Sequence, residues 1–259
     1  MKDEAPIRLI IFICFSLLLM TWEYFAPAYQ QFKKRWKRRV INFGILFIDI
    51  IFLRIIFPSS AVGIAIWAQS KHFGLFNYLD FPPWIEMVIS LLLFDLAIYG
   101  QHALFHFWSP MWRLHRVHHS DTAYDLSLAI RFHPLEILIS LLIKAFLIII
   151  IGPTALTVLV FEVILNSVAL FHHSNIDLGK FDPILRWILV TPKMHRIHHS
   201  SHREETNSNF SFNLSIWDRL FRTHVQSAKE GDDNITIGIE IFREDKEESL
   251  WAILTQPFR

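Results

Sequence analysis

The chain has 14 histidines among its 259 residues, and most of them fall into short clusters with helical spacing. One cluster is a pair at i and i+4 at the end of an apolar run, and the hexapeptides HRVHHS and HRIHHS each place three histidines at i, i+3 and i+4. Side chains at these spacings lie on one face of a helix, so each cluster predicts a row of ring nitrogens that point the same way. The eight candidate metal ligands are His102, His106, His115, His118, His119, His195, His198 and His199.

The number and type of these side chains indicate a metal centre with two ions. A metal ion takes about four to six ligands, so eight or more imidazoles suit two ions better than one. Imidazole binds iron, zinc, copper and nickel and is little used for magnesium or calcium. A lone structural zinc would close its shell with four ligands, and a thiolate site is excluded because the single cysteine, Cys14, lies within an apolar run. We therefore expect two iron ions that activate O2, with zinc as the alternative occupant in the purified protein.

Further polar residues flank the clusters. His173, in the phrase FHHSN, is expected to be a ninth ligand. His172 points elsewhere on the same helix and is a weaker candidate for a ligand or for the support of one. His133 precedes a proline, so a role near the cap of the next helix competes with a role as a ligand or as its support. His202 is a candidate for either role, although such a histidine is more often a solvated side chain. Because a ligand histidine usually holds a hydrogen-bond partner on its other nitrogen, the candidates for that support are Asp121, Asp125, Glu204, Glu205 and Asp218.

Five long apolar segments must position these histidines. Hydrophobic residues make up 53% of the chain, 24 residues are Phe and 9 are Trp, and the mean hydropathy is +0.34. Each segment is long enough to cross, or nearly cross, the ~30 Å hydrocarbon core of a bilayer. The first has no cleavage site after it, so we expect it to be retained as an anchor, and residues 59–69 form an ambiguous apolar piece. The expected segments are residues 7–25, 41–57, 84–107, 135–151 and 155–170.

Charge predicts the orientation of these segments. Residues 33–39 read KKRWKRR, and the positive-inside rule assigns this loop to the cytoplasm. Alternation then puts every histidine cluster on the cytoplasmic side and leaves His72 alone on the other. The absence of a C-terminal dilysine signal favours the bacterial inner membrane over the endoplasmic reticulum. A net charge of +1 gives no reason to expect nucleic acid as a partner.

These segments predict an all-α integral membrane helical bundle with a cytoplasmic helical cap that holds the di-metal site. Segments 135–151 and 155–170 should form an antiparallel hairpin about Gly152 and Pro153. Lys144 and Glu162 lie almost equally far from this turn, so they predict an intramembrane ion pair, with a lipid or water cavity beside Lys144 as the alternative. The expected divisions are 1–83 as membrane anchor, 84–225 as catalytic domain, and 226–259 as a cytoplasmic tail in which 235–241 has the pattern of a strand.

The motifs resemble those of the sterol desaturase and fatty acid hydroxylase superfamily. The similarity covers residues 85–225 and includes one HxxxH, two HxxHH and the phrases LHRVHHSD, LSLAIRFHPLE, FHHSNID, HRIHHSS and NFSFNLSIWDRLFRT. Members are membrane non-haem di-metal oxygenases, and the resemblance implies that the eight motif histidines bind metal and that His173 matches the histidine of the family's FxHSN motif. Where the family often has Asn-Tyr-Gly after the last triad, this chain has Asn209-Phe210-Ser211, which affects the expected loop geometry and leaves Asn209 a further candidate.

The resemblance implies an O2-dependent oxidoreductase that hydroxylates or desaturates a lipid or sterol-like substrate, which would enter from the bilayer past the third to fifth segments. Because the chain has no GxGxxG fingerprint and no CxxC pair, electrons must come from a separate ferredoxin or cytochrome b5-type donor with its reductase, docked on the basic loop at 33–39. Two alternatives stay open. One is a histidine-rich membrane protein that binds or transports metal along a polar path, and the other is a non-catalytic, lipid-binding member of the family.

Overall fold

Long helices make up the body of the molecule in a computed structural model that describes residues 4–30 and 35–259. Five stretches are helical, long and apolar enough to cross a membrane, because an unbroken run of apolar residues lets the helix satisfy its own backbone in hydrocarbon. This confirms the five expected segments. The helices also include charged residues that flank the apolar runs, so α2 begins six residues before its expected start. The long helices are α1 (Glu4–Phe25), α2 (Arg35–Ile56), α4 (Pro83–Phe107), α6 (Pro134–Ile151) and α7 (Ala155–His172).

The ambiguous apolar piece after α2 forms a separate short helix, α3 (Ala61–Ser70). Pro58 follows the end of α2, and the side chain of Ser60 caps α3 by accepting a hydrogen bond from the backbone N–H of Gly63 at 3.0 Å. α3 packs against α6 and α7. Together α2 and α3 form one apolar stretch, Trp36–Ser70.

α6 and α7 form the expected hairpin. Gly152 takes a left-handed conformation, with φ of 71°, at the end of α6, and Thr154 caps α7. The predicted ion pair is confirmed, because Lys144 Nζ lies 3.0 Å from Glu162 Oε1. The sequence did not predict the third member of this group, since Arg8 of α1 also contacts Glu162.

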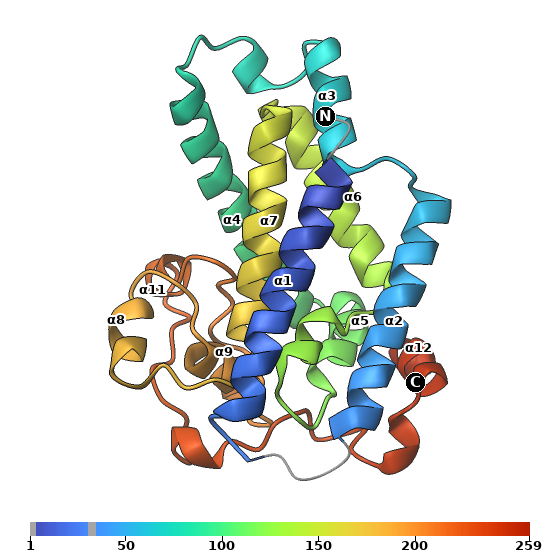
Figure 1. The fold of residues 1–259 in the computed structure, drawn as a ribbon, viewed down its shortest axis with the longest axis vertical. Helices are drawn as coiled ribbons and strands as arrows, with labels where there is room; N and C mark the ends of the chain where they lie inside the picture. Colours follow the sequence, from blue (N-terminus) through green and yellow to red (C-terminus); the bar gives the residue numbers. More distant parts are fainter. Residues whose placement is uncertain (1–3, 31–34) are drawn as a thin grey trace.

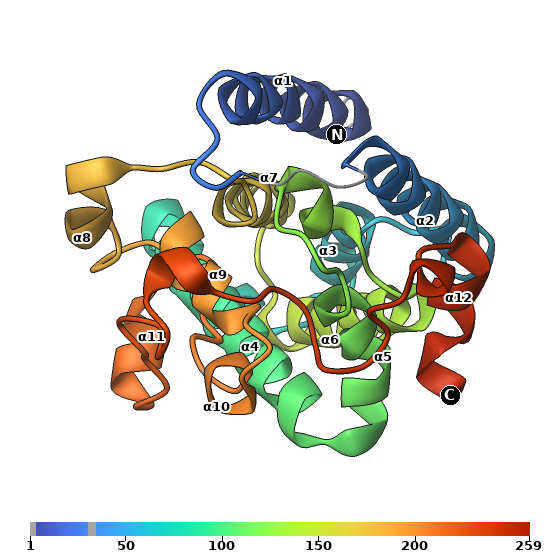
Figure 2. The same cartoon turned by 90° about the horizontal axis from the view of Figure 1, so that it is seen from below.

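The molecule divides into a bundle of long helices and a cap of short helices and loops at one end of it (Figure 1). α1 begins at the end of the bundle away from the cap, and α2 begins at the cap (Figure 1). Seen from below, the cap segments spread across the ends of α4, α6 and α7, while α1 and α2 flank the bundle on one side (Figure 2). The short helices of the cap are α5 (Ser109–His119), α8 (Asp182–Leu185), α9 (Pro192–His198), α10 (Arg203–Thr206), α11 (Ile216–Leu220) and α12 (Leu250–Thr255).

The all-α prediction is confirmed, but the strand expected at 235–241 was wrong. Across residues 4–30 and 35–259 only isolated β-bridges occur, one of them between Ser200 and Ile237. Gly238 has a φ of 94°, and its N–H donates to the carbonyl oxygen of His199 at 3.0 Å. This backbone conformation interrupts the alternation that a strand needs. The segment is therefore a loop that pairs with the residues directly after α9.

Candidate metal centre

Three helices bring the clustered histidines together. α4 supplies the HxxxH pair from its last two turns, and α5 carries one HxxHH triad. The other triad lies at the end of α9, with His199 as the residue that follows the helix. A proline in the first turn starts both short helices, and Thr191 caps α9 with a hydrogen bond from Met194 N. All nine predicted ligands are buried and fall into two groups, in each of which one nitrogen per ring lies within 4.8 Å of all the others. The first group is His102, His106, His115, His119 and His198, and the second is His118, His173, His195 and His199.

In the second group the ring nitrogens lie so close to one another that lone pairs facing each other would repel. The Nε2 atom of His173 lies 3.1 Å from the Nε2 atoms of both His118 and His195. The Nε2 atoms of His195 and His199 are 3.2 Å apart. Converging imidazole lone pairs repel one another unless a cation or a proton lies between them, so this donor set fits a metal ion.

The first group of histidines also suits a metal ion, because several of its ring nitrogens lack a hydrogen-bond partner in the part of the chain that the structure describes. Its inward nitrogens are buried, and four of them have no hydrogen-bond partner among the described residues. Buried polar atoms without a partner are rare in proteins because desolvation is costly, and a metal ion would satisfy all of these at once. The four atoms are Nε2 of His106, His115, His119 and His198.

Several rings are fixed through their outer nitrogen. A carbonyl or carboxylate oxygen can only accept, so the Nδ1 atom facing it carries the proton and leaves Nε2 free as a donor to metal. The partners come from the cap, from α7 and from the first turn of α6. The Nδ1 contacts are His102 with the Phe210 carbonyl at 2.8 Å, His198 with Ser208 at 2.7 Å, His173 with Ala169 at 2.8 Å, and His115 with the Glu136 carboxylate at 2.6 Å.

Burial keeps these imidazoles neutral. Removal from water disfavours the charged form and lowers the pKa of His115 and of His173 to about 3. Burial is also the main cause for His118 and His199, and repulsion from the neighbouring histidines lowers the pKa of each further below its ordinary value. Neutral rings have free lone pairs, so the cluster is ready to bind cations at neutral pH.

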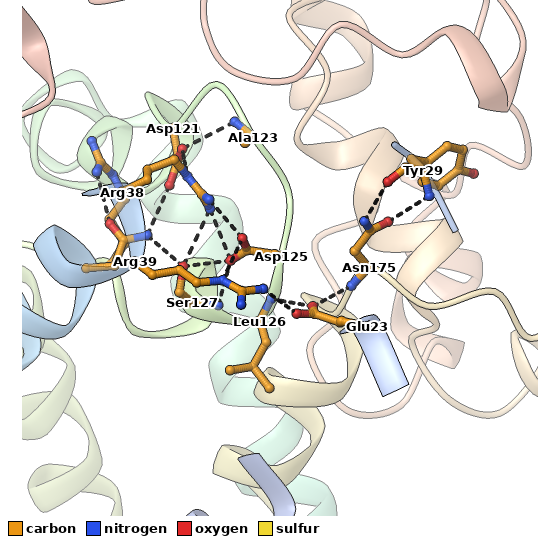
Figure 3. Close-up of polar contacts among 12 residues, drawn as sticks. Glu23, Tyr29, Arg38, Arg39, Asp121, Ala123, Asp125, Leu126, Ser127 and Asn175 are labelled. Atoms are coloured by element: carbon orange, nitrogen blue, oxygen red, sulfur yellow. Dashed lines mark hydrogen bonds and ion pairs between the residues drawn. The ribbon is translucent and has the colours of Figure 1, made fainter. Parts of the chain in front are cut away.

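Asp121 and Asp125 are part of a buried ionic network rather than partners of the rings (Figure 3). Arg38 of α2 donates to Asp121 at 2.5 Å and to Asp125 at 2.8 Å. Arg39 donates to Asp125 and to Glu23 of α1, and Glu23 in turn accepts the N–H of Asn175 at 2.7 Å. The network therefore fastens the loops that follow α5 and α7 to the two flanking helices.

The other candidates near the clusters lie in varied places. His172 is fully buried, and its ring centroid is 4.2 Å from that of His195, so it borders the second group instead of pointing away from it. His133 caps α6, since its Nδ1 accepts from Leu135 N at 3.2 Å. His202 is 42% exposed and faces Glu230.

The remaining candidates are polar residues of the cap. Glu204 is an exposed partner of Lys229, and Glu205 accepts from the Lys229 backbone at 2.6 Å. Asn209 takes a φ of 51° and binds the Val225 backbone through its side chain at 2.9 and 3.0 Å. Asp218 accepts the N–H of Phe210, and so holds the residue whose carbonyl binds a histidine of the first group.

Two side-chain partners of the rings were not predicted from the sequence. Glu136 binds His115, and the Asn207 side chain lies 3.4 Å from Nδ1 of His106. Glu136 had a signal that was available, because a carboxylate in the first turn of a very apolar helix is costly unless it has a partner. Asn207 had none, since it is one of several polar residues in a polar loop.

A cavity of about 590 Å³ begins at the histidines and runs into the bundle. Histidines of both groups line its inner end, among them His102 and His118. Phe105 and Phe132 line the same end, and the walls further along come from α1, α2, α3, α4, α6 and α7. This size is in the range of ligand pockets, so the metal centre has room beside it for part of an apolar molecule. The sequence led us to expect that the substrate enters past the third to fifth apolar segments. The cavity is also lined by α1 and α2, which are the first and second of these segments.

Comparison with known proteins gives consistent matches. The alkylglycerol monooxygenase of Homo sapiens is 32% identical over 160 residues, which are 62% of this chain and 34% of that protein. The ornithine lipid hydroxylase of Rhizobium tropici is 28% identical over 204 residues, 78% of this chain and 59% of that protein. The chain thus spans between one third and three fifths of the length of these relatives. No solved structure matches it.

The family model described as fatty acid hydroxylase matches residues 87–223. This range begins in α4 and ends just after α11, so it includes every histidine of the two groups. The order of the motifs, their place at the ends of membrane helices and their convergence agree with this match. The chain belongs to the fatty acid hydroxylase family.

Proposed function

We propose that this protein is a membrane-bound oxygenase that hydroxylates a lipid with the help of two iron ions, O2 and external electrons. The observation that carries the proposal is the convergence of nine buried imidazoles in two groups at the inner end of a cavity that enters the membrane helices. The relatives named as a lipid hydroxylase and as alkylglycerol monooxygenases support a lipid substrate and insertion of oxygen.

When bound, a pair of iron ions supplies the redox chemistry that lets O2 attack a C–H bond, and this chain supplies the geometry. The outer partners of His115 and His198 hold the rings so that Nε2 points inward. Phe105 and Phe132 line the inner end of the cavity, exclude water and hold an apolar chain against the histidines. Overall, O2, a pair of electrons and a pair of protons would convert the C–H bond into an alcohol and give one water.

The electrons would come from a separate ferredoxin or cytochrome b5-type protein with its reductase. The proposed docking loop offers fewer free charges than its sequence indicates, because Arg38 and Arg39 are occupied by buried carboxylates. Lys33 and Lys34 lie outside the described residues. Docking on this loop remains a prediction.

We also propose that the metal centre faces the cytoplasm. Arg38 belongs to the basic segment that the positive-inside rule assigns to the cytoplasm. It binds Asp121, which directly follows the hexapeptide HRVHHS. The basic segment and the histidines therefore lie at the same end of the bundle, whichever compartment that end faces. Placement in a bacterial inner membrane remains a prediction.

Metal transport is the weaker alternative. A transporter would need a path for cations through the membrane. The cavity that leads away from the histidines is instead lined by Lys144 and Arg8 with the single carboxylate of Glu162 between them. The net positive charge of this group opposes the passage of a metal ion.

The experiment compares the wild-type protein with His118→Ala, purified from cells supplied with iron. We expect two iron ions per wild-type chain and a new hydroxylated lipid in the producing cells. His118→Ala should lose iron and lower the product roughly 100-fold or more, because losing a ligand costs at least as much as losing its support. His202→Ala is the matched control and should keep both. A His118→Ala protein that still forms the product would refute the mechanism.

A further inference from the structure

The cavity beside the histidines has an unusual wall for the middle of a membrane. Lys144 of α6, Glu162 of α7 and Arg8 of α1 all line it. Each lies within a helix that is apolar enough to span the bilayer. Charged side chains in such positions are rare and mark binding sites or pathways when they face a cavity.

These three residues, called the charged triad below, have more hydrogen-bond donors than acceptors. Glu162 accepts from Lys144 through Oε1 and from Arg8 through Oε2. Lys144 gives one of its three N–H groups to this contact and Arg8 gives one of its five. Within the described part of the chain neither cation binds a second acceptor. The triad is partly open, since the Arg8 side chain is 30% exposed and the Lys144 side chain 15%.

One further cation and one further carboxylate line the end of the cavity away from the histidines. Arg54, in the last turn of α2, lines it. So does Glu4, whose Oε1 accepts from Ser60 at 2.7 Å. The half of the cavity away from the histidines thus has three cationic side chains against two carboxylates. An anionic group would satisfy the free donors and balance this charge.

We propose that the charged triad binds the anionic headgroup, a carboxylate or a phosphate, of an amphiphile whose hydrocarbon chain runs along the cavity to the histidines. The cavity extends to the N-terminal end of α1 and the C-terminal end of α2, where Glu4 and Arg54 line it. These helix ends lie at the end of the bundle away from the cap (Figure 1). The amphiphile enters there, from the leaflet opposite the metal centre. This inference rests on the proposed function for the reaction, but not for the binding of the headgroup.

The helices set the distance between headgroup and metal centre. Glu136 contacts His115, and Lys144 follows eight residues later on α6, which is about 12 Å at 1.5 Å per residue. Glu162 precedes His173 by eleven residues on α7, about 16 Å. An extended chain advances about 1.2 Å per bond. The oxidised carbon therefore lies about ten to thirteen bonds from the anionic group.

The test measures binding without chemistry, in neutral maltoside micelles, by thermal stabilisation of the purified full chain. The probes are palmitate, hexadecyl phosphate, hexadecanol and inorganic phosphate. We expect the first two to bind at least ten-fold more tightly than hexadecanol, and the stronger of them identifies the headgroup. Inorganic phosphate should not compete, because it has no chain to fill the apolar part of the cavity. Equal binding of hexadecanol, or binding of inorganic phosphate alone, would overturn the proposal.

Variants separate recognition from structural support. Lys144→Met should weaken the better anionic probe at least ten-fold and leave hexadecanol unchanged, and Lys71→Met, at an exposed site outside the cavity, is the matched control. Glu162→Gln should keep or tighten anion binding, because it removes the competing carboxylate. If Lys144→Met and Glu162→Gln weaken all amphiphiles equally, the triad is only a structural ion pair.

The two proposals fail in different ways. Anion binding without any oxidised product in producing cells would refute the oxygenase but support the headgroup site. An oxidised lipid whose new oxygen lies next to its headgroup, located by tandem mass spectrometry, would overturn the orientation of the chain in the cavity and leave the oxygenase intact.

Discussion

At the scale of single residues, the metal centre depends on what holds each ring from outside. The histidines that face each other across the two groups are supported mostly by backbone carbonyls. Glu136 is different, because it supplies a carboxylate to His115, and its second oxygen is buried without a partner among the described residues. A carboxylate acceptor makes the imidazole a stronger donor to metal than a carbonyl does.

Glu136→Ala should therefore lower metal affinity about 10- to 100-fold. Glu136→Gln should lose less, since its amide oxygen still accepts from His115. Metal retained against a graded series of chelator concentrations, measured by elemental analysis, gives the comparison. Glu204→Gln, at an exposed site on the cap, is the control. Full retention of metal by Glu136→Ala would show that the contact does not support the ring.

At the scale of elements, the turn of the α6–α7 hairpin sets the relative height of the two helices. Its position brings Lys144 and Glu162 level with each other. The turn also packs against the loop after α3, where Gly74 approaches Gly152 closely. Residue 152 must therefore adopt a positive φ and must also leave room for the neighbouring loop, and glycine meets both requirements.

Gly152→Ala should destabilise the protein by at least about 1–2 kcal/mol, because φ is 71° there and a Cβ atom would lie 2.8 Å from the carbonyl oxygen of Phe73. Gly100→Ala in α4 is the matched control, since its Cβ atom would meet nothing within 4 Å. That change should be neutral or slightly stabilising in a helix. Thermal unfolding in the same detergent compares them, and equal melting temperatures would contradict the assigned strain.

At the scale of the whole molecule, the network around Arg38 joins the membrane helices to the cap (Figure 3). Its members come from α1, α2 and the loops after α5 and α7. Burial by itself would raise the pKa of Asp125, but Arg38 and Arg39 outweigh it and hold this pKa below its ordinary value. The carboxylate therefore stays charged and paired at neutral pH.

Asp125→Asn should lower the free energy of unfolding by about 3–5 kcal/mol at pH 7, as expected when one partner of a buried pair is removed. Because the pKa of Asp125 is lower in the folded state, the wild-type advantage is complete above about pH 4 and decreases as the pH falls further. The measurement is the difference in the free energy of unfolding between wild type and Asp125→Asn, taken from pH 7 to pH 3. Protonation of the histidines affects both proteins equally and cancels in this difference. A difference that grows on acidification would contradict this assignment.

The sequence by itself determined the helices and the identity of the ring atoms. Long apolar runs can only be helical in a bilayer, and the spacing of HxxxH and HxxHH places rings on one face whatever the fold. The pairing of Lys144 with Glu162 also followed, because both lie on one hairpin with a known turn.

Only the tertiary structure decided how the nine histidines divide between the two groups. His118 and His119 are neighbours in the chain but belong to different groups, since successive residues on a helix point about 100° apart and the facing helices receive them separately. It also decided that Arg8 joins Glu162 and that Arg38, rather than a histidine, takes Asp121 and Asp125. These partners lie 80 or more residues apart, and no local spacing encodes contacts that depend on how helices pack.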